Sequence, residues 1–174
     1  MEPDQDPLGS FETWAASRQH ALLRSTFLIT GDLHRAEDLV QDALFKVALR
    51  WDRLRSGNPD AYIRTVIYRS NISWWRSRRE SPVESVRDAS ACSDHDPDAQ
   101  ERPMMVRDAL ALLTVKQRAV LVLRYFDDLT EAQTAEVLGV TVGTVKKQAA
   151  VAQQRLREMA PELRDLAGRQ DDSS

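Results

Sequence analysis

The sequence of 174 residues has little of what stabilises secreted domains, β-rich folds or membrane spans. Its single cysteine, Cys92, excludes an internal disulfide and predicts a reducing, cytoplasmic location. Only six glycines and seven prolines are present, which argues against a turn-rich β-sandwich or barrel. The longest uncharged apolar run is far shorter than the ~20 residues that span a bilayer, so membrane insertion is not expected. Residues 1–10 also lack the basic and apolar regions of a signal peptide.

Patterns typical of catalytic and metal sites are lacking as well. Cys92 and His95 could supply half of a metal site, but no second pair lies at ligand spacing. We find no glycine-rich phosphate loop, no Ser/His/Asp set and no carboxylate pair in a plausible pocket. We therefore expect no metal, no cofactor and no enzymatic activity from this chain.

Charge is unevenly distributed along the chain, although the net charge is only −3. Residues 50–79 carry eight arginines against two aspartates, and residues 143–164 carry five Lys/Arg against two glutamates. The intervening residues 80–102 carry seven acidic residues against two arginines. Two basic segments separated by an acidic one indicate two surfaces that could face nucleic-acid phosphates.

Apolar residues recur at helical spacing in two parts of the chain, and strand-like alternation does not persist in either. We therefore predict an all-α fold of two small helical domains joined by a flexible acidic linker. The spacing predicts helices from Ser10 to Thr30, from Asp32 to Trp51 and from Asp60 to about Arg79, with Gly31 as a stop. The predicted segments are a disordered N-terminus (1–10), a first domain (11–80), the linker (81–102), a second domain (103–164) and an acidic tail (165–174).

The second domain, where helical periodicity resumes at Met104, contains the most informative motif. Residues 130–157, "TEAQTAEVLGVTVGTVKKQAAVAQQRLR", have the spacing of a helix-turn-helix. Gly139 can adopt the positive φ of the tight turn, Val140 is expected to fill the angle between the helices, and Val145 to lock the pair. The helix after Thr141 would then lie in a DNA major groove, whereas a plain helical hairpin is the alternative.

The stretch "SWWRSRRE" (73–80) places two tryptophans among arginines, which suits a lipid surface, a nucleic acid or the end of a core helix. Counting about 100° per residue puts Trp74 on the same helix face as Ile63 and Ile67, so it is expected to pack inward. Trp75 falls beside the arginines. It could stack on an unpaired base or pack on a neighbouring helix.

Two longer segments resemble extracytoplasmic-function (ECF, group 4) RNA polymerase sigma factors, closest to the actinobacterial sigma-E-like branch. "LLRSTFLITGDLHRAEDLVQDALFKVALRWDRL" followed by "NPDAYIRTVIYRSNISWWRSRRE" resembles sigma region 2, and "LLTVKQRAVLVLRYFDDLTEAQTAEVLGVTVGTVKKQAAVAQQRLR" resembles region 4. The resemblance covers about residues 11–160 in the family's order. It implies a sigma factor that binds core RNA polymerase, recognises the −35 and −10 promoter elements and helps melt DNA. A free-standing helix-turn-helix regulator is the alternative, although it leaves the first domain without a role.

The resemblance also implies partners and contact residues. The partners are the β′ clamp helices and β flap of core polymerase, promoter DNA and an anti-sigma factor. The implied polymerase contacts are Asp38, Leu39, Gln41 and Asp42. The implied −10 contacts are Arg64, Arg69, Asn71, Trp75, Arg76, Arg78 and Arg79, and the −35 contacts are Thr141, Thr144, Lys146, Lys147, Gln148 and Arg155.

The sequence departs from the family pattern at two places. Arg69 stands where relatives often carry asparagine, and Asn71 follows two residues later, which predicts an unusual −10 preference. The segment "KKQAAVAQQ" has fewer cations than many relatives, so weaker phosphate contacts are expected. Because glutamine can pair bidentately with adenine, Gln148 is the best base-reading candidate.

Overall fold

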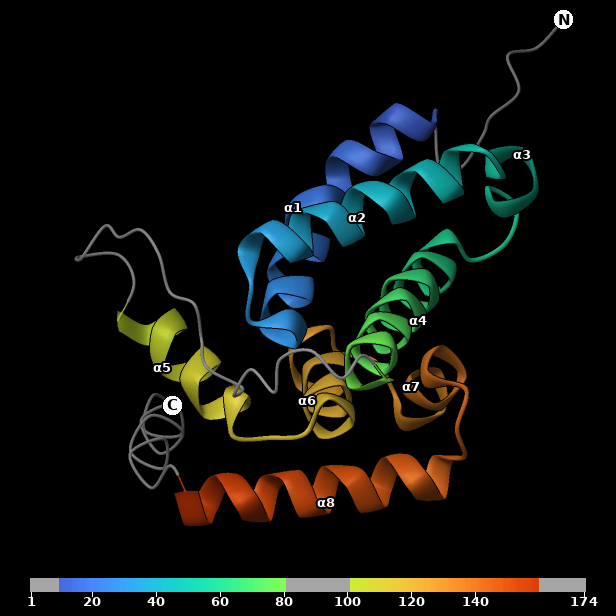
Figure 1. Ribbon diagram of the computed structural model, residues 1–174. Helices are drawn as coiled ribbons and strands as arrows, with labels where there is room; N and C mark the ends of the chain where they lie inside the picture. The colour runs from blue at the N-terminus through green and yellow to red at the C-terminus, as the bar shows by residue number, and fades with distance from the viewer. Residues whose placement is uncertain (1–9, 81–100, 160–174) are drawn as a thin grey trace, which may run out of the picture. The chain divides into compact units, whose positions relative to one another are not determined.

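The computed structural model describes residues 10–80 and 101–159 (Figure 1). Most of the predicted linker and all of the predicted acidic tail lie outside the described residues, as do Cys92 and His95. The chain divides into two compact units, Met1–Glu84 and Ser85–Ser174. All regular secondary structure in the described ranges is helical, which confirms the predicted fold class. Within those ranges no helix is long and apolar enough to cross a membrane, and no cluster of acidic, His or Cys side chains could hold a metal ion.

Four helices lie in the described part of the first unit, residues 10–80. Residues at their ends determine where the first two begin and stop. α1 (Phe11–Thr30) begins at the N-cap Ser10 and ends at Gly31, whose φ of 73° lies in the left-handed region, so both predicted ends are confirmed. α2 (Leu33–Ala48) begins at the N-cap Asp32, whose carboxylate accepts from the Arg35 amide. α3 (Trp51–Leu54) and α4 (Pro59–Glu80) follow.

The prediction of a single helix from Asp32 to Trp51 is wrong, because Trp51 begins the separate helix α3. Its ring lies 5.3 Å from the Trp14 ring and 5.7 Å from the Phe11 ring, centroid to centroid. A break after Ala48 lets this indole pack against the start of α1, and aromatic packing of this kind outweighs helix propensity.

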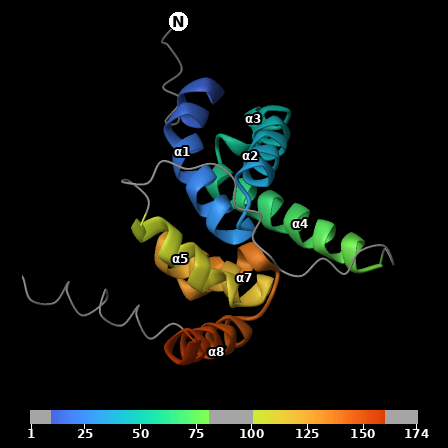
Figure 2. The same ribbon diagram turned by 60° about the vertical axis from the view of Figure 1, so that its left-hand side comes forward.

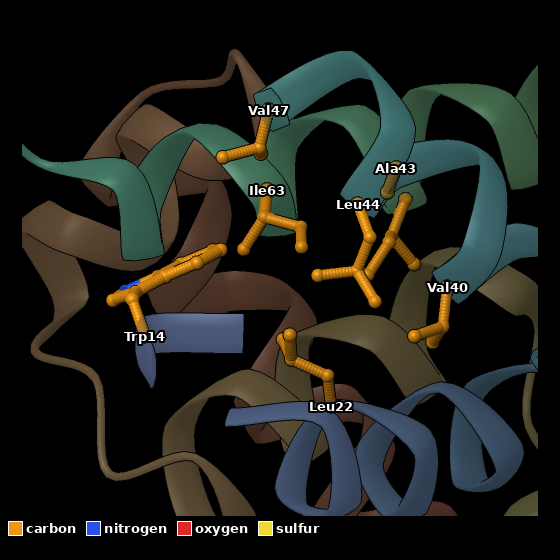
Figure 3. Close-up of a cluster of buried hydrophobic side chains, with 8 residues drawn as sticks. Trp14, Leu22, Val40, Ala43, Leu44, Val47 and Ile63 are labelled. Carbon is orange, nitrogen blue, oxygen red and sulfur yellow. The ribbon is translucent and has the colours of Figure 1, made fainter. Parts of the chain in front are cut away.

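The core of the first unit lies where α2 packs against both α1 and α4 (Figure 3). Leu22 of α1, Val47 of α2 and Ile63 of α4 are buried there, and Trp14 closes one end of the cluster. α2 therefore has one apolar face committed to two neighbours, which leaves its opposite face to solvent.

The second unit contains α5 (Glu101–Ala111), α6 (Val115–Leu121), the π-helical turn η1 (Val122–Phe126), α7 (Glu131–Leu138) and α8 (Val142–Met159). α8 packs against α5, α6 and α7. Figure 2 shows α8 in red below α5 and α7. α5 begins at Glu101, three residues before Met104, where the sequence predicted that helical periodicity resumes. Pro103 is accommodated because the first amides of a helix have no intrahelical acceptor.

The predicted helix-turn-helix geometry is present in α7 and α8. Gly139 has a φ of 65°, and Val145, at 0% exposure, packs with Ala135 and Val120, which confirms the turn and the locking residue. Val140, however, is 39% exposed and does not fill the angle between the helices. Its amide donates to the Ala135 carbonyl at 3.0 Å, and this turn directs the side chain outward.

Candidate protein and nucleic-acid interfaces

The exposed side of α2 carries most of the residues predicted to contact a protein partner. Asp38, Gln41 and Asp42 are all exposed, and Asp42 accepts from Lys46 Nζ at 2.6 Å. Leu39 is half-buried and lies toward the apolar side, so it is less accessible than its predicted role requires.

Two apolar residues that the sequence analysis missed extend this surface. Phe45 is 62% exposed and Leu49, which ends α2, is 68% exposed. Counting about 100° per residue places both within about 100° of Asp38, Gln41 and Asp42. The signal was present in the sequence, since Phe45 falls on the polar side of the helical pattern. We call these five residues the α2 face: Asp38, Gln41, Asp42, Phe45 and Leu49.

Exposed aromatic and aliphatic side chains beside acids and an amide are typical of a protein-binding surface. Burying Phe45 and Leu49 would supply hydrophobic free energy, and the carboxylates could meet cations on the partner. The composition of the α2 face is thus complementary to a protein surface that is basic and partly apolar.

Asn71 is not available to DNA in this structure, contrary to its predicted −10 contact. Its side chain is 0% exposed, and its Oδ1 accepts from Arg35 Nε at 3.2 Å and Arg35 Nη2 at 3.1 Å. The helical count did not reveal this, because the arginine that meets Asn71 comes from a different helix.

The arginines of α4 differ in how freely they could meet phosphates. Arg69 and Arg76 are exposed. Arg64 is turned back along the helix, where its Nη1 donates to the Asp60 carbonyl at 3.1 Å and lies 3.9 Å from the Asp60 carboxylate. The side chains of Arg78 and Arg79 lie outside the described residues.

The paired tryptophans are both half-buried, and they contact each other. The Trp74 and Trp75 ring centroids are 5.1 Å apart in an edge-to-face arrangement. The Arg35 guanidinium carbon lies 3.4 Å from the Trp74 ring centroid, so Trp74 packs inward against α2. Tyr68, which lies about 20° around the helix from Trp75 at 100° per residue, is buried, and this burial raises the pKa of its phenol.

α8 exposes Lys147, one of the predicted −35 contacts, together with residues that the prediction did not include. Lys147, Ala150, Val151 and Gln154 are exposed and lie within about 100° of one another around the helix. Gln148 is half-buried, at the edge between this exposed side and the buried Val145. Gly143 is also exposed, about 40° around the helix from Lys147. We call these five residues the α8 face: Gly143, Lys147, Ala150, Val151 and Gln154.

The remaining predicted −35 residues divide into exposed and internally bonded groups. Thr141 and Thr144 are exposed at the start of α8, with their hydroxyl oxygens 2.9 Å apart. Lys146 Nζ lies 3.4 Å from the Glu131 carboxylate. Arg155 is half-buried and donates to Gln117 Oε1 at 3.2 Å, an oxygen that also accepts from the Thr114 amide. Arg155 therefore joins α8 to the cap of α6 and is not turned toward a ligand.

Comparison with known proteins relates both units to one family. Residues 16–81 match the family described as Sigma-70 region 2, and residues 104–156 match Sigma-70, region 4. An RNA polymerase sigma-E factor of Streptomyces avermitilis is 40% identical over 162 residues, which cover 91% of this chain and 89% of that protein. The ECF RNA polymerase sigma factor SigL of Mycobacterium tuberculosis is 33% identical over 156 residues, which cover 83% and 86%.

Solved structures are similar in fold. The sigma factor RpoE of Bartonella quintana, in complex with the anti-sigma factor NepR, matches with a TM-score of 0.72 and 24% identity, covering 85% of this chain and 94% of that one. CnrH in complex with the cytosolic domain of CnrY matches with a TM-score of 0.63 and 19% identity, covering 91% and 94%.

Proposed function

Because this chain belongs to the ECF RNA polymerase sigma factors of the sigma-70 family, we propose that the α2 face and the α8 face are its surfaces for polymerase and promoter. The protein binds core RNA polymerase and directs promoter-specific initiation. The match of the first unit to region 2 favours this function over that of a free-standing regulator. We place the protein in the cytoplasm and expect polymerase, not this chain, to supply the catalytic groups.

The α2 face is our candidate for the surface that binds the β′ clamp helices. The observation that carries this assignment is the exposure of Phe45 and Leu49 next to Asp38, Gln41 and Asp42. Apolar anchors ringed by polar groups are the usual anatomy of a tight protein interface. Leu39 can contribute only at the edge of this surface, because it is half-buried.

For the −10 element, the exposed Arg69 and Arg76 and the half-buried Trp75 are our candidates. The arginines can neutralise phosphates, and an indole can stack on a base that has left the duplex. Arg78 and Arg79 remain predicted phosphate contacts. Arg64 and Asn71 are better explained by their contacts within the first unit.

For the −35 element, we assign base reading to the α8 face. Thr141 and Thr144 lie where backbone amides and the helix dipole favour a phosphate. Lys147 can donate to guanine, and the exposed Val151 and Ala150 can contact thymine methyl groups. Gln154 donates through Nε2 to Glu158 Oε1 at 2.9 Å, so it can pair with adenine only after leaving that contact. Lys146 adds positive charge beside this face, although Glu131 partly offsets it.

Alanine variants of two neighbouring residues test this assignment. We expect Lys147→Ala to reduce −35-dependent transcription by about 10-fold, because one good base or phosphate contact is worth about 1–3 kcal/mol. Gln148→Ala should change it by less than about 2-fold, since this side chain is half-buried at the edge of the face. Abortive initiation from promoters with and without a −35 element measures both. The opposite ranking would restore Gln148 as the base reader.

We also propose an anti-sigma factor as a partner. The solved structures of RpoE with NepR and of CnrH with CnrY are complexes of similarly folded proteins, which supports the idea. Co-purification from the native host, followed by inhibition of transcription with the captured protein, tests it.

Reconstitution tests the overall function directly. Core polymerase mixed with this protein should initiate at defined start sites on genomic promoter fragments, whereas core alone should not. The fragments can be chosen by sequencing the DNA that the holoenzyme retains. If the holoenzyme initiated specifically on none of the retained fragments, the proposal would be contradicted.

A further inference from the structure

Arg35, in the first turn of α2, makes contacts with α4 that the family comparison does not assign. Its Nε and Nη2 both donate to Asn71 Oδ1, at 3.2 and 3.1 Å. Its guanidinium carbon also lies 3.4 Å from the centroid of the Trp74 ring. One side chain therefore holds two consecutive turns of α4 through a forked hydrogen bond and a stacking contact.

Asn71 makes this contact hard to replace. Its side chain is fully buried, and its Nδ2 has no hydrogen-bond partner among the described residues. The amide oxygen consequently depends on Arg35, and losing the fork would leave a buried polar group with neither end satisfied. At Asn71, the contact between α4 and α2 thus depends on one arginine, Arg35.

The same arginine acts on Trp75 through Trp74. Arg35 covers the Trp74 ring, and Trp75 packs edge-to-face on Trp74 at 5.1 Å with an interplanar angle of 87°. Arg76 follows directly and is exposed. A change that moves the Trp74 ring would alter its packing on Trp75, because the two rings are in edge-to-face contact.

We propose that Arg35 is a positioning residue that holds Trp75 and Arg76, through Asn71 and Trp74, in the orientation that promoter melting requires. This inference rests on the proposed −10 role of Trp75 and Arg76. Counting about 100° per residue, Arg35 lies about 20° around α2 from Asp42 and about 80° from Phe45, so it continues one edge of the α2 face toward the start of the helix. One helix thereby carries the proposed polymerase contact and also sets the geometry of the DNA-facing end of α4.

Substitution by lysine isolates this role, since it keeps the charge but loses the planar fork and the stacking surface. We expect holoenzyme with Arg35→Lys to form open complexes on duplex promoter about 10-fold more slowly, as one or two such contacts would imply. On a promoter with a pre-opened −10 bubble the rate should recover to within about 2-fold, because melting no longer limits it. Arg53→Lys, at an exposed arginine of α3, is the matched control and should match the wild type in both assays.

A second comparison separates positioning from stability. In a Trp75→Ala background, Arg35→Lys should slow open-complex formation on duplex promoter by less than about a further 2-fold, since both changes remove the same function. Equal defects on duplex and bubble together with a lower melting temperature would overturn the inference and leave a purely structural residue. A defect with Trp75→Ala but none with Arg35→Lys would overturn it while leaving the −10 assignment intact. Normal melting by both variants would reject the −10 role of Trp75 itself.

Discussion

Replacing Phe45 and Leu49 together by alanine is expected to weaken binding to core RNA polymerase by about 30-fold or more. Buried aromatic anchors at the centre of an interface are worth about 2 kcal/mol or more, and 1.4 kcal/mol corresponds to a factor of ten. The two side chains are the most exposed large apolar groups of α2, at 62% and 68%. Folding should be unaffected, because neither residue belongs to the core cluster of the first unit.

Titration of labelled core polymerase with the variant measures this loss, and circular dichroism checks that α2 remains helical. Leu33→Ala is the matched control, since Leu33 is also an exposed apolar residue of α2 but lies about 120° around the helix from Phe45. It should bind within about 2-fold of the wild type. If the double alanine variant bound core polymerase as tightly as Leu33→Ala and the wild type, the α2 face would not be the polymerase contact.

Replacing Arg118 by methionine is expected to destabilise the second unit by about 2–3 kcal/mol. Arg118 is buried in α6, and its Nε donates to the Leu110 carbonyl at 2.9 Å while its Nη2 donates to the Leu113 carbonyl at 3.3 Å. These carbonyls lie at the end of α5 and in the turn that follows, and the Leu110 carbonyl also accepts from the Leu113 amide at 3.1 Å. Methionine fills much of the volume but leaves both oxygens without this charged donor.

Hydrogen exchange resolves the effect because it reports on each unit separately. The exchange free energy of the most protected amides in α6 and α8 should fall by about 2–3 kcal/mol, whereas that of α2 and α4 should not change. Lys116→Met removes a cation from an exposed position of the same helix and should shift exchange by less than about 0.5 kcal/mol. Similar shifts for the two variants would show that charge, and not the carbonyl contacts, is responsible.

Much of the local structure could be predicted from the sequence, because it depends on neighbours along the chain. Helix ends are marked by residues whose capping contacts reach only a few positions along the chain: Ser10, Asp32, Thr130 and Gly139. Such signals can be recognised from the sequence alone. Predictions about side-chain partners were weaker. Asn71 and Arg155 were expected to face DNA, yet their partners lie 36 and 38 residues away.

The sequence by itself determined that the protein is all-helical, that it contains a helix-turn-helix with Gly139 at the turn, and which family it belongs to. Helical periodicity and capping suffice for the helices and the turn, because both act over one or two turns. The family follows instead from the resemblance of two long segments to sigma regions 2 and 4. The tertiary structure alone decided that Asn71 and Arg155 are committed to internal contacts and that Arg35 reaches across to Trp74. A helical count shows the direction in which a side chain leaves its helix. Which neighbouring helix it meets, and therefore whether it is free to bind a ligand, depends on packing.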